Sequence, residues 1–107
     1  MSDAVMERLA WTISQRRLAT AEASYTRSLL DGGREKCARK FGEEAVETVI
    51  AGLIGDREAV TAEAADTIYH LLVLLEMNGV SWAEVSAKLT ARMGVSGHDE
   101  KAARSFI

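Results

Sequence analysis

The chain has 107 residues, of which 48% are hydrophobic, 6% aromatic and 27% charged, which is typical of one soluble globular domain and too apolar for a disordered protein. The net charge of −3 argues against a general nucleic-acid-binding surface, and no apolar run reaches the roughly 20 residues that span a bilayer. We therefore expect one domain over residues 1–107, with neither a nucleic-acid nor a membrane partner.

Turn-forming residues divide the sequence into segments. Each segment is predicted to be a helix, because the chain contains no proline and shows no strand-like alternation. Asp3 can cap a first helix that reaches about Ala19. The apolar side of this helix consists of Val5, Leu9 and Ile13, with Trp11 as a further candidate. A short element follows from Ser24 to about Leu30, and the sequence Asp-Gly-Gly ends it.

Two long helices joined by a tight turn are predicted next. The first runs from about residue 34 to residue 54 and is closed by Gly55. Asp56 then caps the second, which runs from residue 57 to about residue 77 and stops at Asn-Gly. Because the connection is so short, the two helices are expected to pack antiparallel.

The last predicted helix opens at Ser81, where Glu84 stands three residues later and completes a capping box. This helix ends near Met93. Together the elements predict an all-α fold, an antiparallel bundle of about four main helices. Because the chain is short and offers little aromatic bulk, we expect it to bury further surface by pairing as a homodimer.

Two pairs of acidic residues lie on the two long helices, and each pair is spaced so that both carboxylates face the same way. Glu44 and Glu47 form the first pair, and Glu63 and Asp66 form the second. Glu47 stands nine residues before Asp56 and Asp66 stands ten after it. At about 1.5 Å rise per residue, the pairs therefore come to nearly the same height on antiparallel helices.

Four carboxylates at one height would repel one another strongly unless a cation lay between them. Such hard oxygen ligands suit Mg²⁺ or Mn²⁺. Lys and Arg dominate residues 27–40 and acids dominate residues 43–66, a division that suits a site for phosphates and a divalent cation. The pattern favours a metal site over its alternative, a set of solvent-exposed acids on ordinary helix faces.

Three neighbours of these acids have two possible roles each. Glu43 lies beside the same face and either activates a water molecule or is an exposed bystander. His70 either supports the metal site or packs as a helix-face residue beside Tyr69, and packing is favoured. Cys37 is most simply a small buried residue.

Several stretches of the chain resemble one known family. They are SYT at 24–26, GEEAVE at 42–47, EAAD at 63–66, YHLLVLL at 69–75 and the ending SGHDEKAAR at 96–104. Together they resemble the phosphoribosyl-ATP pyrophosphohydrolase family, which belongs to the all-α NTP pyrophosphohydrolase superfamily. The acidic motif marks only the superfamily, whereas the first and last stretches point to this member of it.

The resemblance implies Mg²⁺-dependent hydrolysis of phosphoribosyl-ATP between its α and β phosphates. The products are phosphoribosyl-AMP and pyrophosphate, in the second step of histidine biosynthesis. It also implies an α-helical homodimer and metal binding by Glu44, Glu47, Glu63 and Asp66. The candidate catalytic residues are Glu43 and Glu47. The residues at family-like positions for phosphate contact are Lys36, Lys40, Lys101 and Arg104, and for each of them plain surface charge is the alternative.

Two other functions are open at this point. A general (d)NTP pyrophosphohydrolase of the same superfamily would share the carboxylates and differ in its base and ribose pocket. A non-catalytic helical dimer would carry the acids on solvent-exposed helix faces.

The first ten residues lack the apolar core of a signal peptide, and the single cysteine cannot form an internal disulfide. We therefore expect a cytoplasmic protein.

Overall fold

The structure is a computed structural model that describes residues 4–93. All regular structure in this range is helical. The elements are α1 (Ala4–Gln15), the 3₁₀ turn η1 (Arg16–Leu18), α2 (Tyr25–Asp31), α3 (Gly33–Ile54), α4 (Arg57–Met77) and α5 (Trp82–Arg92). The predicted all-α class is thus confirmed for the described residues. None of these helices is long and apolar enough to cross a membrane.

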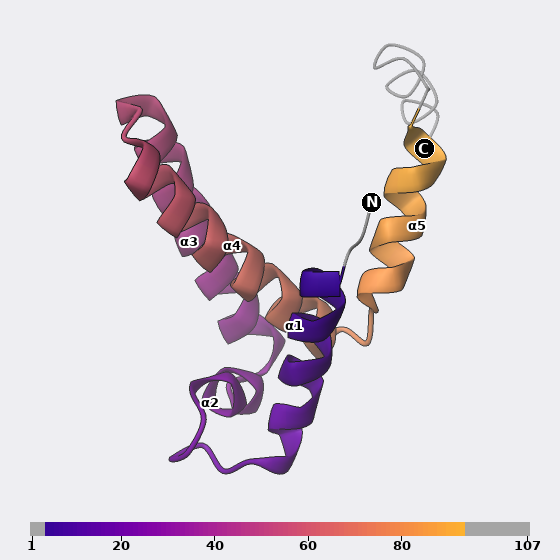
Figure 1. The fold of residues 1–107 in the computed structure, drawn as a ribbon. Helices are drawn as coiled ribbons and strands as arrows, with labels where there is room; N and C mark the ends of the chain where they lie inside the picture. The colour runs from indigo at the N-terminus through magenta and orange to yellow at the C-terminus, as the bar shows by residue number, and fades with distance from the viewer. Residues whose placement is uncertain (1–3, 94–107) are drawn as a thin grey trace.

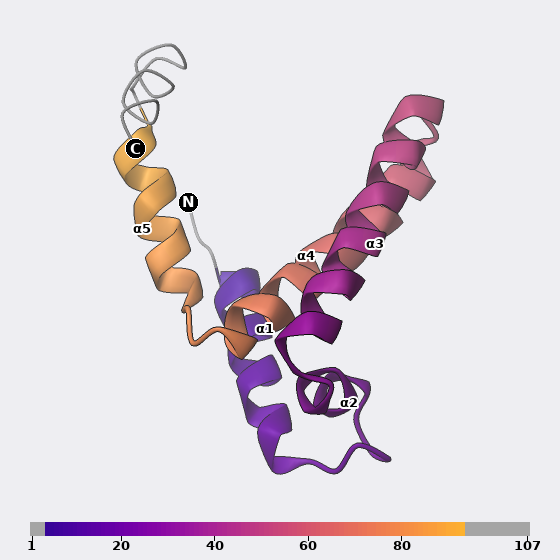
Figure 2. The ribbon, with the colours of Figure 1, turned by 180° about the vertical axis from the view of Figure 1, so that it is seen from behind.

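Helices α3 and α4 lie side by side and antiparallel along the long dimension of the molecule (Figure 1, Figure 2). Gly55 ends α3 in the left-handed conformation, with φ of 85°, and donates its N–H to the carbonyl of Ala51. Asp56 then caps α4, and its carboxylate accepts the N–H groups of Glu58 and Ala59. The tight turn and the bounds of α4 are therefore as predicted.

Helices α2 and α5 also begin where the sequence predicted, and α5 begins at its predicted cap. The Ser24 hydroxyl accepts the N–H of Arg27 at the start of α2. At the start of α5, the Ser81 hydroxyl accepts the N–H of Glu84, and the Glu84 carboxylate accepts the N–H of Ser81. The predicted capping box is confirmed, whereas Asp3, the predicted cap of α1, lies outside the described residues.

Helix α1 ends earlier than predicted, at Gln15 rather than near Ala19, and the chain tightens into η1. The reason lies in Arg27, whose guanidinium donates to the backbone carbonyls of Arg17 and Ala19. These carbonyls are thereby held outside an α-helix. Arg17 in turn pairs with Glu76 near the end of α4 at 2.6 Å, which fastens η1 to the end of that helix.

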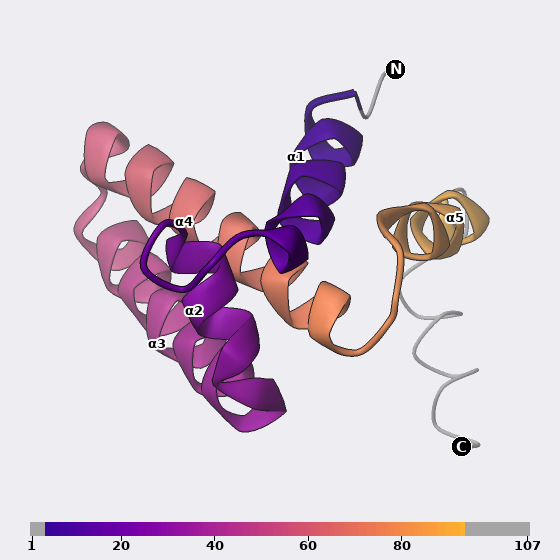
Figure 3. The ribbon, with the colours of Figure 1, turned by 90° about the horizontal axis from the view of Figure 1, so that it is seen from below.

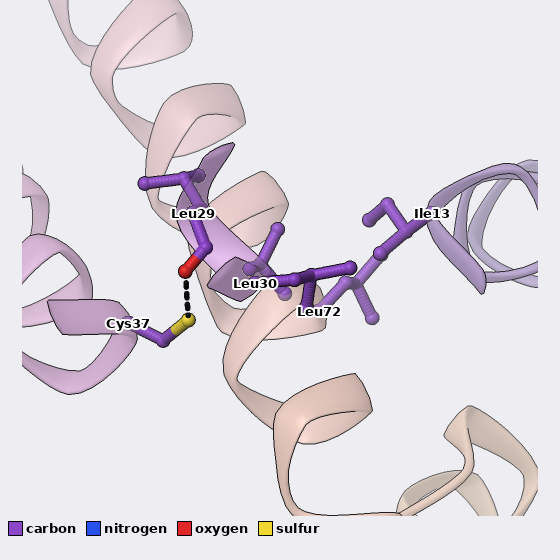
Figure 4. Close-up of a cluster of buried hydrophobic side chains, with 6 residues drawn as sticks. Ile13, Leu29, Leu30, Cys37 and Leu72 are labelled. Carbon is purple, nitrogen blue, oxygen red and sulfur yellow. Dashed lines mark hydrogen bonds between the residues drawn. The ribbon is translucent and has the colours of Figure 1, made fainter. Parts of the chain in front are cut away.

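The buried core gathers where α1 and α2 pack against α3 and α4. It consists of Ile13, Leu29, Leu30, Cys37, Leu72 and Val73. Figure 4 shows the Cys37 thiol donating to the backbone carbonyl of Leu29, at 3.2 Å. Cys37 is 1% exposed, so its predicted burial is confirmed. We call this part of the molecule, made of α1, α2 and the portions of α3 and α4 around the core, the base.

Beyond the base, residues 46–66 at the connected ends of α3 and α4 form a two-helix segment that we call the arm. Ala51 is the one buried residue in this range. The large apolar side chains that α3 exposes along the arm are Val46, Val49, Ile50, Leu53 and Ile54. Helix α5 contacts α1 and stands apart from α3 (Figure 3), while its first residue, Trp82, packs against the core.

The apolar side of α1 is narrower than the sequence predicted. Ile13 is buried and Leu9 packs against the core, but Val5 is 65% exposed and Trp11 is 64% exposed. Trp11 borders a groove of about 220 Å³, which Trp82 of α5 also lines. The prediction was wrong for Val5, and the further candidate Trp11 is exposed as well, because α1 packs against α4 with one face and α5 leaves the other partly open.

Candidate metal centre

Three carboxylates from the two long helices meet where the arm joins the base. Glu44 of α3 and Glu63 and Asp66 of α4 each offer an oxygen, and these oxygens all lie within 4.8 Å of one another. Glu44 and Glu63 are half-buried, whereas Asp66 is exposed. The antiparallel pairing of α3 with α4 therefore brings together three of the four residues predicted to bind metal. We call these three the carboxylate cluster.

Glu47, the fourth predicted ligand, lies beside Glu44 but outside that set of three. Burial raises the pKa of Glu44, and a hydrogen bond to Glu47 raises it further. The negative charges of Glu47, Asp66 and Glu63 act in the same direction. The negative charges of the cluster thus oppose one another's ionisation. A bound cation would favour the ionised carboxylates instead.

One oxygen of the cluster has no partner among the described residues. Glu63 Oε2 is buried and accepts no hydrogen bond, which is unfavourable for a carboxylate. It lies on the residue that shares the cluster with Glu44 and Asp66. An all-carboxylate donor set with a free buried oxygen fits a hard divalent cation.

Basic side chains precede the cluster along α3, on the base side. The Lys40 ammonium lies 3.3 Å from a carboxylate oxygen of Glu43, and Arg39 Nε lies 3.8 Å from the other. The hydrogen bond to Glu43 raises the pKa of Lys40. Lys36 lies one turn earlier on α3 and is half-buried. Two further predicted phosphate contacts lie outside the described residues: Lys101 and Arg104.

His70 is buried against the cluster. It is 5% exposed, and its ring packs edge-on against Tyr69 with the ring centres 4.9 Å apart. Its Nε2 lies 3.9 Å from Glu44 Oε1. Burial lowers the pKa of His70, and the charge of Lys40 lowers it further, so both favour the neutral ring. The predicted packing beside Tyr69 is confirmed.

The arm has a pocket of about 310 Å³ next to the cluster. Its lining joins two carboxylates to apolar side chains of both helices: Glu47, Ile50, Ala51, Ile54, Ala59 and Glu63. The carboxylate cluster is thus continuous with the exposed apolar surface of the arm. A molecule bound on that apolar surface would also cover the edge of the cluster.

Two threonines that the sequence reasoning missed link the helices at the cluster. Thr48 Oγ1 and Thr67 Oγ1 lie 2.7 Å apart across the α3–α4 interface. Each stands four residues after a carboxylate of the cluster, Thr48 after Glu44 and Thr67 after Glu63. This repeated spacing could have pointed to the two threonines in the sequence. Threonine is a poor helix former, so its presence in the middle of two long helices indicates another role.

Comparison with known proteins identifies the family. The family model described as phosphoribosyl-ATP pyrophosphohydrolase matches residues 6–93. Phosphoribosyl-ATP pyrophosphatase 1 of Bradyrhizobium diazoefficiens is 56% identical over 90% of this chain and 91% of its own length. The phosphoribosyl-ATP pyrophosphatase of Cereibacter sphaeroides is 54% identical over 94% and 97%, and that of Azorhizobium caulinodans is 55% identical over 86% and 84%. The chain, with its carboxylates drawn from two antiparallel helices, therefore belongs to the phosphoribosyl-ATP pyrophosphohydrolase family.

Proposed function

We propose that the chain hydrolyses phosphoribosyl-ATP to phosphoribosyl-AMP and pyrophosphate, the second step of histidine biosynthesis. Its membership of the family over residues 6–93 supports the reaction. The observation that carries the site is the meeting of Glu44, Glu63 and Asp66 within 4.8 Å. We assign this activity to a single cytoplasmic domain over residues 1–107.

We propose Mg²⁺, replaceable by Mn²⁺, as the cofactor, with Glu44, Glu47, Glu63 and Asp66 as the residues that would hold it. A divalent cation bound there supplies neutralisation of the polyphosphate charge and activation of water. The raised pKa of Glu44 and the partnerless buried oxygen of Glu63 support this assignment, because both are unfavourable features that a cation relieves.

The remaining residues have roles that follow from their charge and position. Lys40, beside the cluster, attracts the phosphates, and Lys36 extends this positive charge by one turn of α3. Glu43, held by Lys40 and Arg39, is an exposed carboxylate that can orient a water molecule or accept its proton. Glu47 is the second candidate for that task. Lys101 and Arg104 remain candidates for phosphate contact on their sequence alone.

We also propose that two copies pair through the arm. The exposed residues Val46, Val49, Ile50 and Leu53 follow the three- and four-residue spacing of one helix face. A contiguous apolar stripe of this kind is typical of a protein interface. Because the pocket beside the cluster contains Ile50 and Ile54, a second copy on this stripe would also close one side of the candidate metal centre.

The first test is pyrophosphate release from phosphoribosyl-ATP, with ATP and dUTP as comparison substrates and with Mg²⁺ or EDTA in each case. We expect Mg²⁺-dependent release from phosphoribosyl-ATP and little from the two triphosphates. Turnover of ATP or dUTP instead would favour a general triphosphate pyrophosphohydrolase. No turnover of any of the three would favour a non-catalytic helical dimer.

The second test removes ligand charge from the candidate centre. Glu47→Gln and Asp66→Asn should each abolish turnover, because each removes the charge of a proposed ligand, and even residues that only orient metal ligands cost about ten- to hundredfold when they are altered. Both side chains are exposed, so circular dichroism should show an intact fold. Glu58→Gln is the matched control, since it removes one exposed charge on α4 away from the cluster and should leave turnover unchanged. Unfolding of the two variants would contradict the assigned role.

A further inference from the structure

The interface between α3 and α4 contains a small polar link at the level of the carboxylate cluster. Thr67 Oγ1 lies 2.9 Å from the backbone carbonyl of Glu44 on the other helix. Thr48 Oγ1 lies 3.0 Å from the backbone carbonyl of Glu63, also on the other helix. Each hydroxyl therefore reaches across to the carbonyl of a carboxylate residue of the cluster.

The link holds however the two hydroxyl protons are placed. Thr48 can donate to the carbonyl of Glu63, to that of Glu44 at 3.1 Å in its own helix, or to the Thr67 hydroxyl. Thr67 can donate to the carbonyl of Glu44 or to the Thr48 hydroxyl, and both choices cross the interface. At least one interhelical hydrogen bond is therefore present in every arrangement.

This link is well placed to set the register of the two helices. An α-helix advances 1.5 Å and turns about 100° per residue, so a small slide or rotation of α4 against α3 would move Glu63 and Asp66 away from Glu44. The large apolar side chains of α3 along the arm are exposed, so they contribute little to fixing this register. Mg²⁺ in turn requires near-ideal ligand geometry.

We propose that Thr48 and Thr67 are positioning residues, whose hydroxyls hold α3 and α4 in the register that brings Glu44 to Glu63 and Asp66. The inference rests on the proposed metal-dependent function and adds to it the residues that keep the centre assembled. The two threonine hydroxyls contact the backbone carbonyls of Glu44 and Glu63, and we assign them no contact with substrate.

The test compares the parent protein with Thr48→Val, Thr67→Val and Thr67→Ser. Valine keeps the shape of threonine and removes the hydroxyl, and the carbonyls of Glu44 and Glu63 keep their bonds within each helix. Serine retains the hydroxyl and is the rescue variant. Thr61→Val is the matched control, because the Thr61 hydroxyl bonds to the carbonyl of Arg57 in its own helix, at 2.8 Å, and is exposed.

The readout is Mn²⁺ affinity, measured by electron paramagnetic resonance without substrate and well below the melting temperature of each variant. Thr67→Val should weaken Mn²⁺ binding about tenfold or more, the range seen when groups that orient metal ligands are altered, and Thr48→Val should act in the same direction. Thr67→Ser and Thr61→Val should bind as the parent does. In activity assays, Thr67→Val should require more Mg²⁺ for half-maximal rate.

Three negative results have different meanings. Parent-like Mn²⁺ affinity in both valine variants, with a metal-binding parent, would overturn the positioning role and leave the proposed function intact. A parent protein that binds no Mn²⁺ would overturn the metal centre and the positioning role with it. Weakened binding in Thr67→Val that Thr67→Ser shares would show that the hydroxyl by itself does not hold the register, and would also overturn the proposal.

Discussion

The base and the arm of this molecule are built from the same two long helices but stabilised in different ways. In the base, α1 and α2 cover α3 and α4, and the side chains of Ile13, Leu29 and Val73 are at most 2% exposed. In the arm, no other helix of the described residues covers α3 and α4 (Figure 1), and Leu53 is 83% exposed. The base therefore has its own core, whereas the arm presents an apolar face that a single chain leaves open.

The carboxylate cluster lies at the boundary between these two regions. Its base side is fixed by the buried ring of His70, and its arm side opens into the apolar pocket between α3 and α4. One side of the site is therefore buried and packed, and the other side is open. The base side of the cluster is therefore closed within one chain, whereas under the proposed pairing a second copy would close the arm side.

The largest expected effect is in the base. Leu29→Ala should lower the free energy of unfolding by about 2–5 kcal/mol, because it removes a fully buried side chain and leaves a cavity. Leu18→Ala is the control, since Leu18 is 84% exposed, and it should change stability by less than about 0.5 kcal/mol. Urea denaturation of both variants measures the difference. If both variants lost the same free energy of unfolding, burial in the base would not explain the effect of Leu29→Ala.

In the arm, the corresponding change should act on assembly. Leu53→Glu places a carboxylate on the exposed apolar stripe, and burial of an unpaired charge in an interface is strongly unfavourable. The dimer dissociation constant should rise at least about a hundredfold, which corresponds to about 2.8 kcal/mol. Sedimentation velocity measures the shift, and Ala38→Glu, on the exposed side of α3 in the base, should leave assembly unchanged. A Leu53→Glu protein that still pairs would place the interface elsewhere.

A smaller effect is expected at the tip of the arm. Asp56→Ala removes the carboxylate that accepts the N–H groups of Glu58 and Ala59, and loss of such a cap lowers stability by about 1 kcal/mol. Asp56→Asn should retain most of the stability, because asparagine caps helices equally well. Thermal denaturation of the three proteins distinguishes a cap from a merely acidic surface residue, for which the two substitutions would be equivalent.

The smallest effect is a pH dependence in α5, which lies outside both base and arm. The hydrogen bond from the Ser81 N–H lowers the pKa of Glu84 below its usual 4.5. The capping box therefore contributes its full stability above pH 4.5 and loses it as the pH falls through the lowered pKa of the folded state. Amide hydrogen exchange in the first turn of α5 should accelerate over that acid range, beyond its intrinsic pH dependence. Glu84→Gln should abolish this extra dependence.

The sequence predicted those features that depend on neighbouring residues. Asp56 and the Asn-Gly pair fixed the ends of α4, and the three-residue spacing of Glu63 and Asp66 placed both on one face. It did not reveal features that depend on contacts between helices. The early end of α1 follows from the reach of Arg27 across the loop, and the exposure of Trp11 follows from the direction in which α5 leaves the base.

The candidate site shows the same division. Equal distances from the turn predicted that Glu44 would meet Glu63 and Asp66, because helix rise is regular. They did not predict that Glu47 would stand outside the closest set, since a small rotation of α3 decides which of two neighbouring carboxylates points inward. Nor did they indicate the hydroxyl link through Thr48 and Thr67, which exists only once the two helices are packed.

Cys37 makes the folded protein suitable for site-directed labelling. Its thiol is the only one in the sequence, it is buried in the base, and burial raises its pKa, so little reactive thiolate is available at neutral pH. A maleimide or nitroxide reagent should therefore leave the native chain largely unmodified. A cysteine introduced by Glu58→Cys near the tip of the arm would then carry the label alone. Pairs of such labels would report how two copies meet, without prior removal of the native thiol.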